Sequence, residues 1–138
     1  MLTPDPTSNV AIAAFITAGA RLELNKCLEK LQRRNLYCDT DSIILTSRPG
    51  DERLKTGNGL GELTDELLEY GEGCKIREFI GAGPKHYAFK AYDKYDELVK
   101  TVMKVRGITL NVKNSETFNF DTLLDIILNN ADPVFVTN

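Results

Sequence analysis

The sequence contains few of the residues on which several common classes of protein depend. Its only histidine is His86, so a Ser-His-Asp or Cys-His triad would have to pass through it, and no nucleophile motif points to it. The three cysteines are widely spaced, which argues against a disulfide framework or a zinc site and suits reduced thiols. There is no run of about 20 apolar residues. The first residues also lack the basic and apolar segments of a secretory signal, so we expect neither a transmembrane helix nor secretion.

What is present is an ordinary globular composition with an uneven distribution of charge. The 138 residues suffice for one domain with its own core, and 42% apolar and 27% charged residues are normal proportions. The net charge of −3 argues at first against a nucleic-acid partner. Between residues 75 and 113, however, nine basic residues accompany four acidic ones, whereas acidic residues dominate between 51 and 72. A basic half is compatible with a surface that faces phosphates, and solvated charge is the alternative.

A long helix is predicted near the N-terminus. Residues 1–7 contain two prolines and should be irregular, and either Ser8 or Asn9 can cap a helix over residues 10–31. The first turns of this helix, residues 10–16, are apolar on nearly every side, which predicts deep burial. Gly19 costs the helix about 1 kcal/mol relative to Ala, and a close approach of another group to the backbone would explain it.

The rest of the chain is predicted to be mainly strands separated by polar turns. Alternating patterns and aromatic residues predict a hairpin over residues 36–45 and strands over residues 76–80, 86–92 and 99–110. A loop is expected at residues 47–59, and turns at 81–84 and 93–97. Residues 60–67 have apolar spacing that fits a helix, and an apolar stripe predicts a final helix over residues 117–130. These elements predict an α+β fold in which the long helix packs on an antiparallel sheet.

Two acidic residues at the tip of the predicted hairpin form the first candidate site. The stretch LYCDTDSIIL, residues 36–45, places apolar runs on either side of a polar tip. In extended geometry Asp39 and Asp41 would project from the same face, where two like charges repel each other. A cation such as Mg²⁺ would reverse this cost. A lone Asp-x-Asp in a turn is common, however, because Asp favours turns by bonding its own backbone.

Residues suited to contacts with phosphate occur in two other places. Thr17, Ala20 and Arg21 stand at i, i+3 and i+4 and therefore share one helical face, although a buried helix that surfaces at Arg21 is the alternative. Lys85 and Tyr87 would share one face of a strand, where a cation and a phenol can bind a phosphate and pack on a sugar or base. A lysine at a strand start beside a half-buried tyrosine is the common alternative.

The hairpin sequence is similar to that of one family of enzymes. Tyr-Cys-Asp-Thr-Asp-Ser followed by Ile-Ile resembles the C motif of family B DNA polymerases, which lies in a hairpin of the palm domain. The resemblance implies that Asp41 is the main metal ligand, that Asp39 is the supporting carboxylate and that Tyr37 lies close to the primer end. Thr-x-x-Ala-Arg at residues 17–21 resembles a DNA-contacting motif of the protein-primed branch, found in self-synthesising transposons and related viruses.

Two further matches follow in the order of that family. Gly-Pro-Lys-x-Tyr-Ala resembles the Lys-x-Tyr motif that holds the primer strand, which implies this role for Lys85 and Tyr87. Lys-Val-Arg-Gly-Ile, which includes Lys104 and Arg106, resembles the passage from palm to thumb and adds these two residues to the implied DNA contacts. A comparable Leu-Gly-x-x-x-x-Glu element in the family favours a strand for residues 60–67. The resemblance implies a partial palm domain over residues 1–109 and the start of a thumb over residues 110–138.

The function implied is template-directed nucleotidyl transfer by a DNA-directed DNA polymerase with two Mg²⁺ ions. Its partners would be primer-template DNA and dNTP, with a terminal protein primer or the missing N-terminal polymerase part as further candidates, and no membrane. The family draws an opposing carboxylate from an A motif, Asp-x-x-Ser-Leu-Tyr-Pro, and a nucleotide-binding Lys from a B motif, and neither occurs in this sequence. We therefore expect half of a metal site and no polymerisation by the isolated chain, as in a fragment, a split subunit or a decayed gene product.

The main alternative is a non-catalytic DNA-binding or interaction module derived from such a polymerase. It would use Arg21, Lys85 and residues 100–106 on phosphates, so that binding would weaken with salt and would survive Asp41→Ala. A scaffold with neither activity is a third possibility. In each case we expect an intracellular protein, without distinguishing nucleus from cytoplasm.

Overall fold

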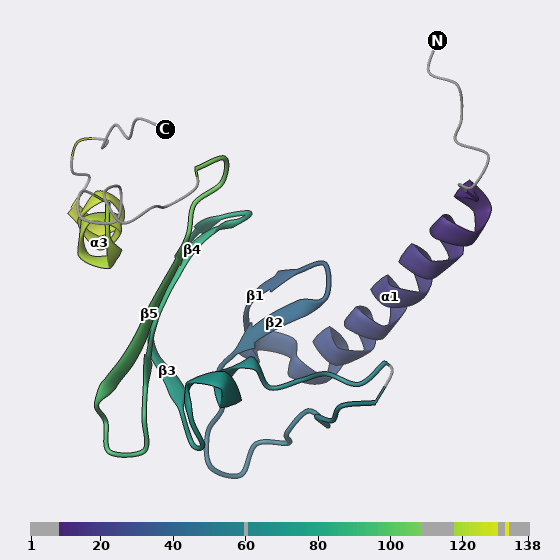
Figure 1. Ribbon diagram of the computed structural model, residues 1–138, viewed down its shortest axis with the longest axis horizontal. Coiled ribbons are helices and arrows are strands. Elements are labelled where there is room, and N and C mark those ends of the chain that lie inside the picture. Colours follow the sequence, from purple (N-terminus) through teal and green to yellow (C-terminus); the bar gives the residue numbers. More distant parts are fainter. Residues whose placement is uncertain (1–8, 60, 109–117, 130–131, 133–138) are drawn as a thin grey trace. The chain divides into compact units, whose positions relative to one another are not determined.

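A computed structural model of the chain describes residues 9–59, 61–108, 118–129 and 132. Figure 1 shows an α+β fold with one long helix, two antiparallel sheets and a short C-terminal helix, as the sequence predicts. The elements are α1 (Val10–Leu31), η1 (Gln32–Arg34), β1 (Asn35–Asp39), β2 (Ser42–Leu45), η2 (Glu66–Tyr70), β3 (Lys75–Gly83), β4 (His86–Tyr92), β5 (Leu98–Lys104) and α3 (Phe120–Asn129). The chain divides into two compact units, residues 1–63 and 64–138. No helix in the described ranges has the length and apolar character needed to cross a membrane.

The first unit begins with α1, whose bounds agree with the prediction. Asn9 is the N-cap, because its side-chain Oδ1 accepts a hydrogen bond of 3.1 Å from the backbone N–H of Ile12. The predicted deep burial of the first turns is wrong: Phe15 is 80% exposed and Ile16 is 67% exposed. An apolar composition indicates that a helix is suited to burial, but it does not show which other element packs on it. Only toward its end does α1 become buried, at Leu31.

The hairpin of the first unit, β1 and β2, also agrees with the prediction. The two strands pair with Cys38 opposite Ile43, and a backbone hydrogen bond of 2.8 Å from Thr46 N to Arg34 O closes the base. The following loop, predicted at residues 47–59, contains no helix or named strand. Arg34 anchors this loop by donating 2.9 Å to the carbonyl of Glu52.

The strand that the resemblance favours at residues 60–67 is wrong. Residue 60 lies outside the described residues, Leu63 makes only an isolated bridge with Thr56, and the chain then enters the 3-10 helix η2. Asp65 begins η2, because its carboxylate accepts a hydrogen bond of 3.0 Å from the N–H of Leu67. This local capping prevents the segment from continuing as an extended strand.

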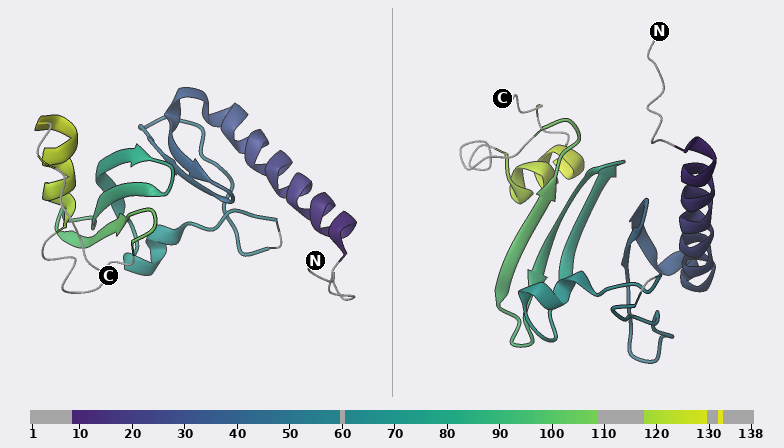
Figure 2. Two further views of the ribbon diagram at one scale, coloured as in Figure 1. Left: turned by 90° about the horizontal axis from the view of Figure 1, so that it is seen from above. Right: turned by 45° about the vertical axis from the view of Figure 1, so that its right-hand side comes forward.

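The second unit is a three-stranded antiparallel sheet in the order β3-β4-β5, with α3 packed on one face (Figure 2). Its core joins Ile80 and Ala88 of the sheet to Phe118, Phe120 and Leu123. The strands predicted at residues 76–80 and 86–92 are confirmed: β4 has the predicted bounds, and β3 is longer than predicted, from Lys75 to Gly83.

Three boundaries in the second unit differ from the expected ones. The turn predicted at 81–84 is a two-residue turn at Pro84 and Lys85, because β3 continues to Gly83. The last strand ends at Lys104, and the expected residues 109–110 lie outside the described part of the chain. The C-terminal helix begins at Phe120 and not at residue 117, because the side chain of Asn119 accepts hydrogen bonds from two backbone N–H groups of its first turn. The division into palm and thumb at residue 109 stays a prediction.

Candidate functional site

The two acidic residues of the hairpin tip lie in different backbone environments. Asp39 ends β1 and is half-buried, whereas Asp41 is exposed and lies in the turn. Thr40 between them has φ 49°, and the backbone N–H of Asp41 donates to the carbonyl of Asp39 at 2.5 Å. The expectation that both carboxylates project from one face of an extended strand is therefore wrong, since the chain turns between them.

The contacts of Asp39 hold its carboxylate at the start of the turn. The hydroxyl of Thr40 donates to Asp39 Oδ1 at 3.1 Å, and the hydroxyl of Ser42 donates to the carbonyl of Asp39 at 3.1 Å. Tyr37 stands two residues earlier on β1, on the same side of the strand as Asp39. The hairpin thus presents a phenol and one carboxylate on a strand face and a second carboxylate, from Asp41, at the exposed tip.

This tip can supply only part of a magnesium site. Mg²⁺ usually takes one or two protein carboxylates and completes its coordination shell with phosphates and water. Asp39 and Asp41 are carboxylates of the required type. Within the ranges that the structure describes, no group of three or more His, Cys, Asp or Glu residues is placed to hold a metal. The residues present therefore fit a weak, incomplete site and give no basis for a catalytic step through the metal.

The helical stripe predicted to contact DNA is exposed along α1. Thr17, Ala20 and Arg21 are all exposed and share one face, as their spacing predicts. The hydroxyl of Thr17 donates to the carbonyl of Ala13 at 2.8 Å, so its hydrogen is already engaged within the helix. Arg21 forms no ion pair with any other described residue, which leaves its guanidinium as the group of this stripe best suited to an anion.

The second unit brings four predicted residues to one end of its sheet. Tyr87 of β4 is directly opposite Lys104 of β5 in the strand register. Lys85, Lys104 and Arg106 line one cleft of about 370 Å³, and none of the described residues that line it is acidic. The cleft is completed by the backbone turn at Gly107, whose φ of +78° lets the chain double back so that Val105 pairs with Ile108.

Lys85 reaches this cleft by a different route from the predicted one. It was expected on a strand, on the same face as Tyr87, but it occupies the turn before β4 with φ 58°. The expectation that Lys85 shares a strand face with Tyr87 is therefore wrong, because Lys85 does not belong to the strand. The tight turn instead sets Lys85 at the end of the sheet where β5 terminates, beside Lys104 and Arg106.

The ring of Tyr87 lies among other aromatic rings. Its centroid is 6.4 Å from that of Phe89 with the planes 6° apart, and 6.3 Å from that of Phe79. His86, the preceding residue, lies on the opposite face, where its ring is 6.5 Å from Phe118. This alternation, which the sequence predicts, fixes the phenol on the face of the sheet that does not carry α3.

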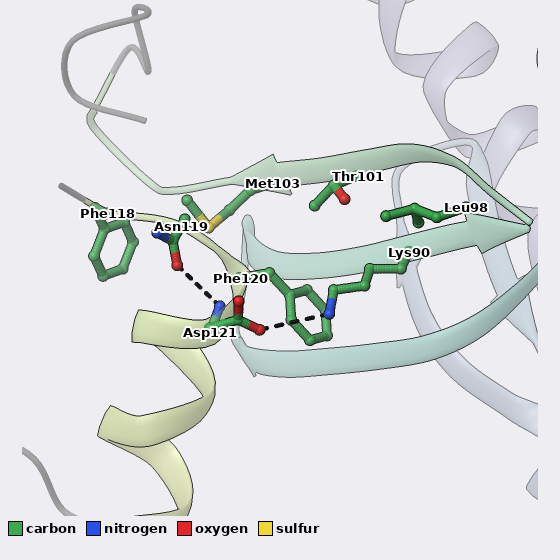
Figure 3. Close-up of a pocket in the computed structure, with 8 residues that line it drawn as sticks. All are labelled: Lys90, Leu98, Thr101, Met103, Phe118, Asn119, Phe120 and Asp121. Carbon is green, nitrogen blue, oxygen red and sulfur yellow. Dashed lines mark hydrogen bonds and ion pairs between the residues drawn. The ribbon is translucent and has the colours of Figure 1, made fainter. Parts of the chain in front are cut away.

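A polar network on the α3 face could not be anticipated from motifs. Lys90 Nζ lies 3.4 Å from Glu78. It also lies 3.5 Å from Asp121 and 4.2 Å from the ring centroid of Phe120, two residues that Figure 3 shows beside it. Burial lowers the pKa of Lys90, but Asp121 and Glu78 together outweigh it and raise that pKa. The hydroxyl of Tyr92 donates to Glu78 at 2.6 Å, which holds the pKa of the Glu78 carboxyl below its ordinary value.

The same network borders a pocket of about 500 Å³ between α3 and the sheet, shown in Figure 3. Lys90 and Asp121 lie at one side of it, and Met103 and Phe118 form apolar walls. Because Lys90 already faces two carboxylates, the network ties α3 to β3 and β4. A signal for it existed in the sequence only as opposite charges on neighbouring strands, whose register is not readable from sequence.

Comparison with known proteins adds no relative: no family model, no curated protein and no solved structure matches this chain. No family is therefore assigned, and the similarity to family B polymerases stays a prediction carried by the motifs.

Proposed function

We propose that this chain binds the sugar-phosphate backbone of primer-template DNA, as a partial palm and thumb of a DNA polymerase of the family B type. The observation that carries the proposal is the cleft of the second unit, which Lys85, Lys104 and Arg106 line. Tyr87 is next to the cleft in the strand register, opposite Lys104. Three cations in one cleft favour a phosphate backbone over a neutral ligand.

The two cation-bearing segments contribute in different ways. Lys104 and Arg106 come from the end of β5 and the turn that follows, where Gly107 brings backbone close to the cleft. Lys85 comes from the β3–β4 turn and closes the other side. Phosphate contacts of this kind fix the register of a nucleic acid without reading its bases, so binding should depend strongly on salt and little on sequence.

For the catalytic part of the proposal, Asp39 and Asp41 would hold Mg²⁺, which supplies charge neutralisation at the reacting phosphates when bound. Because the chain lacks the opposing carboxylate, we expect weak metal binding and no DNA synthesis by the isolated chain. A primer-extension assay with Mg²⁺ and all four dNTPs tests this expectation, and robust incorporation by the purified chain would overturn it.

The DNA-binding part is tested by fluorescence anisotropy with a labelled primer-template duplex at several salt concentrations. The triple variant Lys85→Ala, Lys104→Ala, Arg106→Ala should bind at least tenfold more weakly, and its salt slope should fall by roughly two to three, about one per lost phosphate contact. The matched control is Lys94→Ala, an exposed cation in the β4–β5 turn at the other end of the sheet. Equal binding by the triple variant and the control would refute the assignment of the cleft.

The second candidate function is a non-catalytic DNA-binding module, which the cleft alone also favours. It differs from the first in one respect, since it gives no role to the acidic tip. DNA binding measured with and without Mg²⁺ separates the two: Asp41→Ala should change the effect of Mg²⁺ if the tip holds metal against DNA. An effect of Mg²⁺ that is the same in Asp41→Ala and in the unmodified chain favours the non-catalytic module.

A further inference from the structure

The loop that follows β2 contains two glycines whose missing side chains leave room for a carboxylate. A Cβ added to Gly57 would overlap the carboxylate of Glu62, and a Cβ added to Gly59 would lie 2.9 Å from Glu62 Oε2. Neither glycine has a φ in the left-handed region, so the backbone conformation does not require glycine at these two positions. The position of the Glu62 carboxylate does require it.

Two different donors hold the two oxygens of this carboxylate. Lys55 Nζ lies 3.3 Å from Glu62 Oε1, and the backbone N–H of Gly59 donates to Glu62 Oε2 at 2.9 Å. We call Lys55, Gly57 and Gly59 the cradle. An ammonium group, a backbone N–H and glycine backbone that an anion can approach closely are also the groups with which proteins bind phosphate.

Backbone hydrogen bonds close the loop without the side chain of Glu62. The N–H of Gly57 donates to the carbonyl of Leu63 at 2.8 Å, and Thr56 forms a parallel bridge with Leu63. The N–H of Glu62 donates to the carbonyl of Gly59 at 3.0 Å. All of these residues belong to the first unit. We therefore expect the cradle to keep its backbone geometry when the Glu62 side chain is removed.

The carboxylate in the cradle remains accessible to solvent. The side chain of Glu62 is 35% exposed and that of Lys55 is 88% exposed. An exposed ion pair of this kind contributes little to stability, because water screens it and ordering two long side chains costs entropy. A carboxylate held in this way can exchange with another anion.

We propose that the cradle is a binding site for a phosphate group and that Glu62 blocks this site in the unmodified chain. A phosphate group carries more negative charge than a carboxylate and has more acceptor oxygens, so it gains more from the ammonium and the N–H. Glu62 competes because it is tethered beside the cradle, at an effective concentration on the order of mM or more. The cationic cleft belongs to the other unit, so this site does not rest on the proposed function.

A titration of the ¹⁵N-labelled whole chain with inorganic phosphate, at an ionic strength held constant with chloride, tests the site. In Glu62→Ala the amides of Gly57 and Gly59 should shift and saturate, with a dissociation constant at least tenfold lower than in the unmodified chain. Glu52→Ala is the matched control, since it removes another exposed glutamate from the same loop and should leave the affinity unchanged. Equal affinities in the two variants, or no saturable shift in Glu62→Ala, would overturn the proposal.

Further variants test whether phosphate occupies the cradle itself. When added to Glu62→Ala, Lys55→Ala should weaken phosphate binding at least tenfold, because it removes the ammonium. Arg53→Ala, which removes an exposed cation two residues earlier, is the control and should have little effect. Equal losses from the two changes would indicate diffuse attraction to the loop and would contradict a site in the cradle.

The unmodified chain provides a test that needs no substitution. Phosphate at about 100 mM exceeds the millimolar effective concentration of a tethered group, so it should partly displace Glu62. The side-chain carboxyl ¹³C signal of Glu62 and the amide of Gly59 should then move, while the carboxyl signal of Glu52 should not. Chloride at the same ionic strength should move neither signal. An unchanged Glu62 signal in phosphate would contradict the proposal.

The phosphate group could come from a small molecule or from a nucleic acid, and a labelled primer-template duplex separates these sources. Tighter duplex binding by Glu62→Ala than by Glu52→Ala, by tenfold or more, would assign the site to a nucleic-acid backbone. A gain for inorganic phosphate alone would assign it to a small phosphate compound. The triple variant of the cationic cleft should leave phosphate binding at the cradle unchanged, so a failure of the proposed function is distinguishable from a failure of this site.

Discussion

The two units bury their helices in opposite ways. In the second unit, α3 has 10 residues and sets Phe120 and Leu123 into a core with the sheet, where they are 4% and 2% exposed. In the first unit, α1 has 22 residues but keeps Phe15 and Ile16 largely exposed. The second unit thus contains the elements that cover its own helix, whereas no described element of the first unit covers the apolar N-terminal half of α1.

The difference teaches which parts of the chain can be stable alone. A two-stranded hairpin such as β1–β2 is marginal without packing, and a long helix gains most of its stability in a protein from burial of an apolar face. A three-stranded sheet with a covering helix meets the usual minimum for independent stability. The cationic cleft therefore belongs to the unit that we expect to be stable alone, and the acidic tip belongs to the less stable unit.

The largest expected effect comes from removing one aromatic ring from each unit. Phe120→Ala should lower the free energy of unfolding by about 3–5 kcal/mol, because it leaves a cavity in the core of the second unit. Phe15→Ala should change it by no more than about 0.5 kcal/mol in dilute solution, because the ring is exposed. Urea unfolding followed by circular dichroism measures both changes. Similar losses of unfolding free energy in the two variants would contradict the difference in burial between the two helices.

The polar network that holds α3 predicts a moderate effect of acid on the second unit. The pKa of Glu78 is lower in the folded chain than its ordinary value of 4.5, so its contribution to stability is present above pH 4.5 and is lost as the pH falls through the folded pKa. Denaturation at pH values from 7 to 3 should show a shallower acid loss in Glu78→Gln than in the unmodified chain. Glu72→Gln, at an exposed glutamate, serves as the control and should retain the full acid loss.

The same network predicts the opposite sign in alkali. The hydrogen bond to Glu78 raises the pKa of Tyr92, and the two carboxylates raise that of Lys90. Their contributions are therefore complete below the ordinary pKa values of 10.0 and 10.5 and are lost as the pH rises through the folded values. Spectrophotometric titration of tyrosine at 295 nm should show one late-ionising group that returns to the ordinary range in Glu78→Gln.

The smallest expected effect separates two glycines. Gly19→Ala should stabilise the isolated chain by up to about 1 kcal/mol, because alanine favours the helix and its Cβ meets open space. Gly107→Ala should destabilise it by about 1 kcal/mol, because φ +78° is unfavourable for alanine. Thermal unfolding detects both signs, and a loss of stability in Gly19→Ala would show that packing within the chain already uses the space.

Local patterns predicted elements better than they predicted burial. The spacing of apolar residues and a cap at Ser8 or Asn9 predicted the bounds of α1, and the polar tip between apolar runs predicted the hairpin of β1 and β2. The burial of α1 was wrong, because periodicity describes one helix and says nothing of what packs on it. A strand at residues 60–67 was wrong because the side-chain cap of Asp65 operates within three residues and starts a helical turn instead.

The candidate site was predicted in its residues but not in its geometry. Lys85 and Tyr87 were expected on one strand face, yet Lys85 reaches the cleft from a turn, whereas Tyr87 is opposite Lys104 in the register and is not among the residues that line the cleft. Register here depends on bulges in β3 and β5, which no short motif specifies. For the same reason, the contacts that join Lys90 to Glu78 and Asp121 became visible only in three dimensions.

Nuclear magnetic resonance with a short primer-template duplex tests the central claim most directly, namely that the cleft at the end of β5 holds the phosphate backbone. In a titration of the ¹⁵N-labelled chain at low salt, the backbone amides of residues 85–87 and 104–108 should shift, while those of residues 93–97 at the other end of the sheet stay in place. Shifts confined to residues 93–97, or no shifts at residues 104–108 at saturating DNA, would contradict the account.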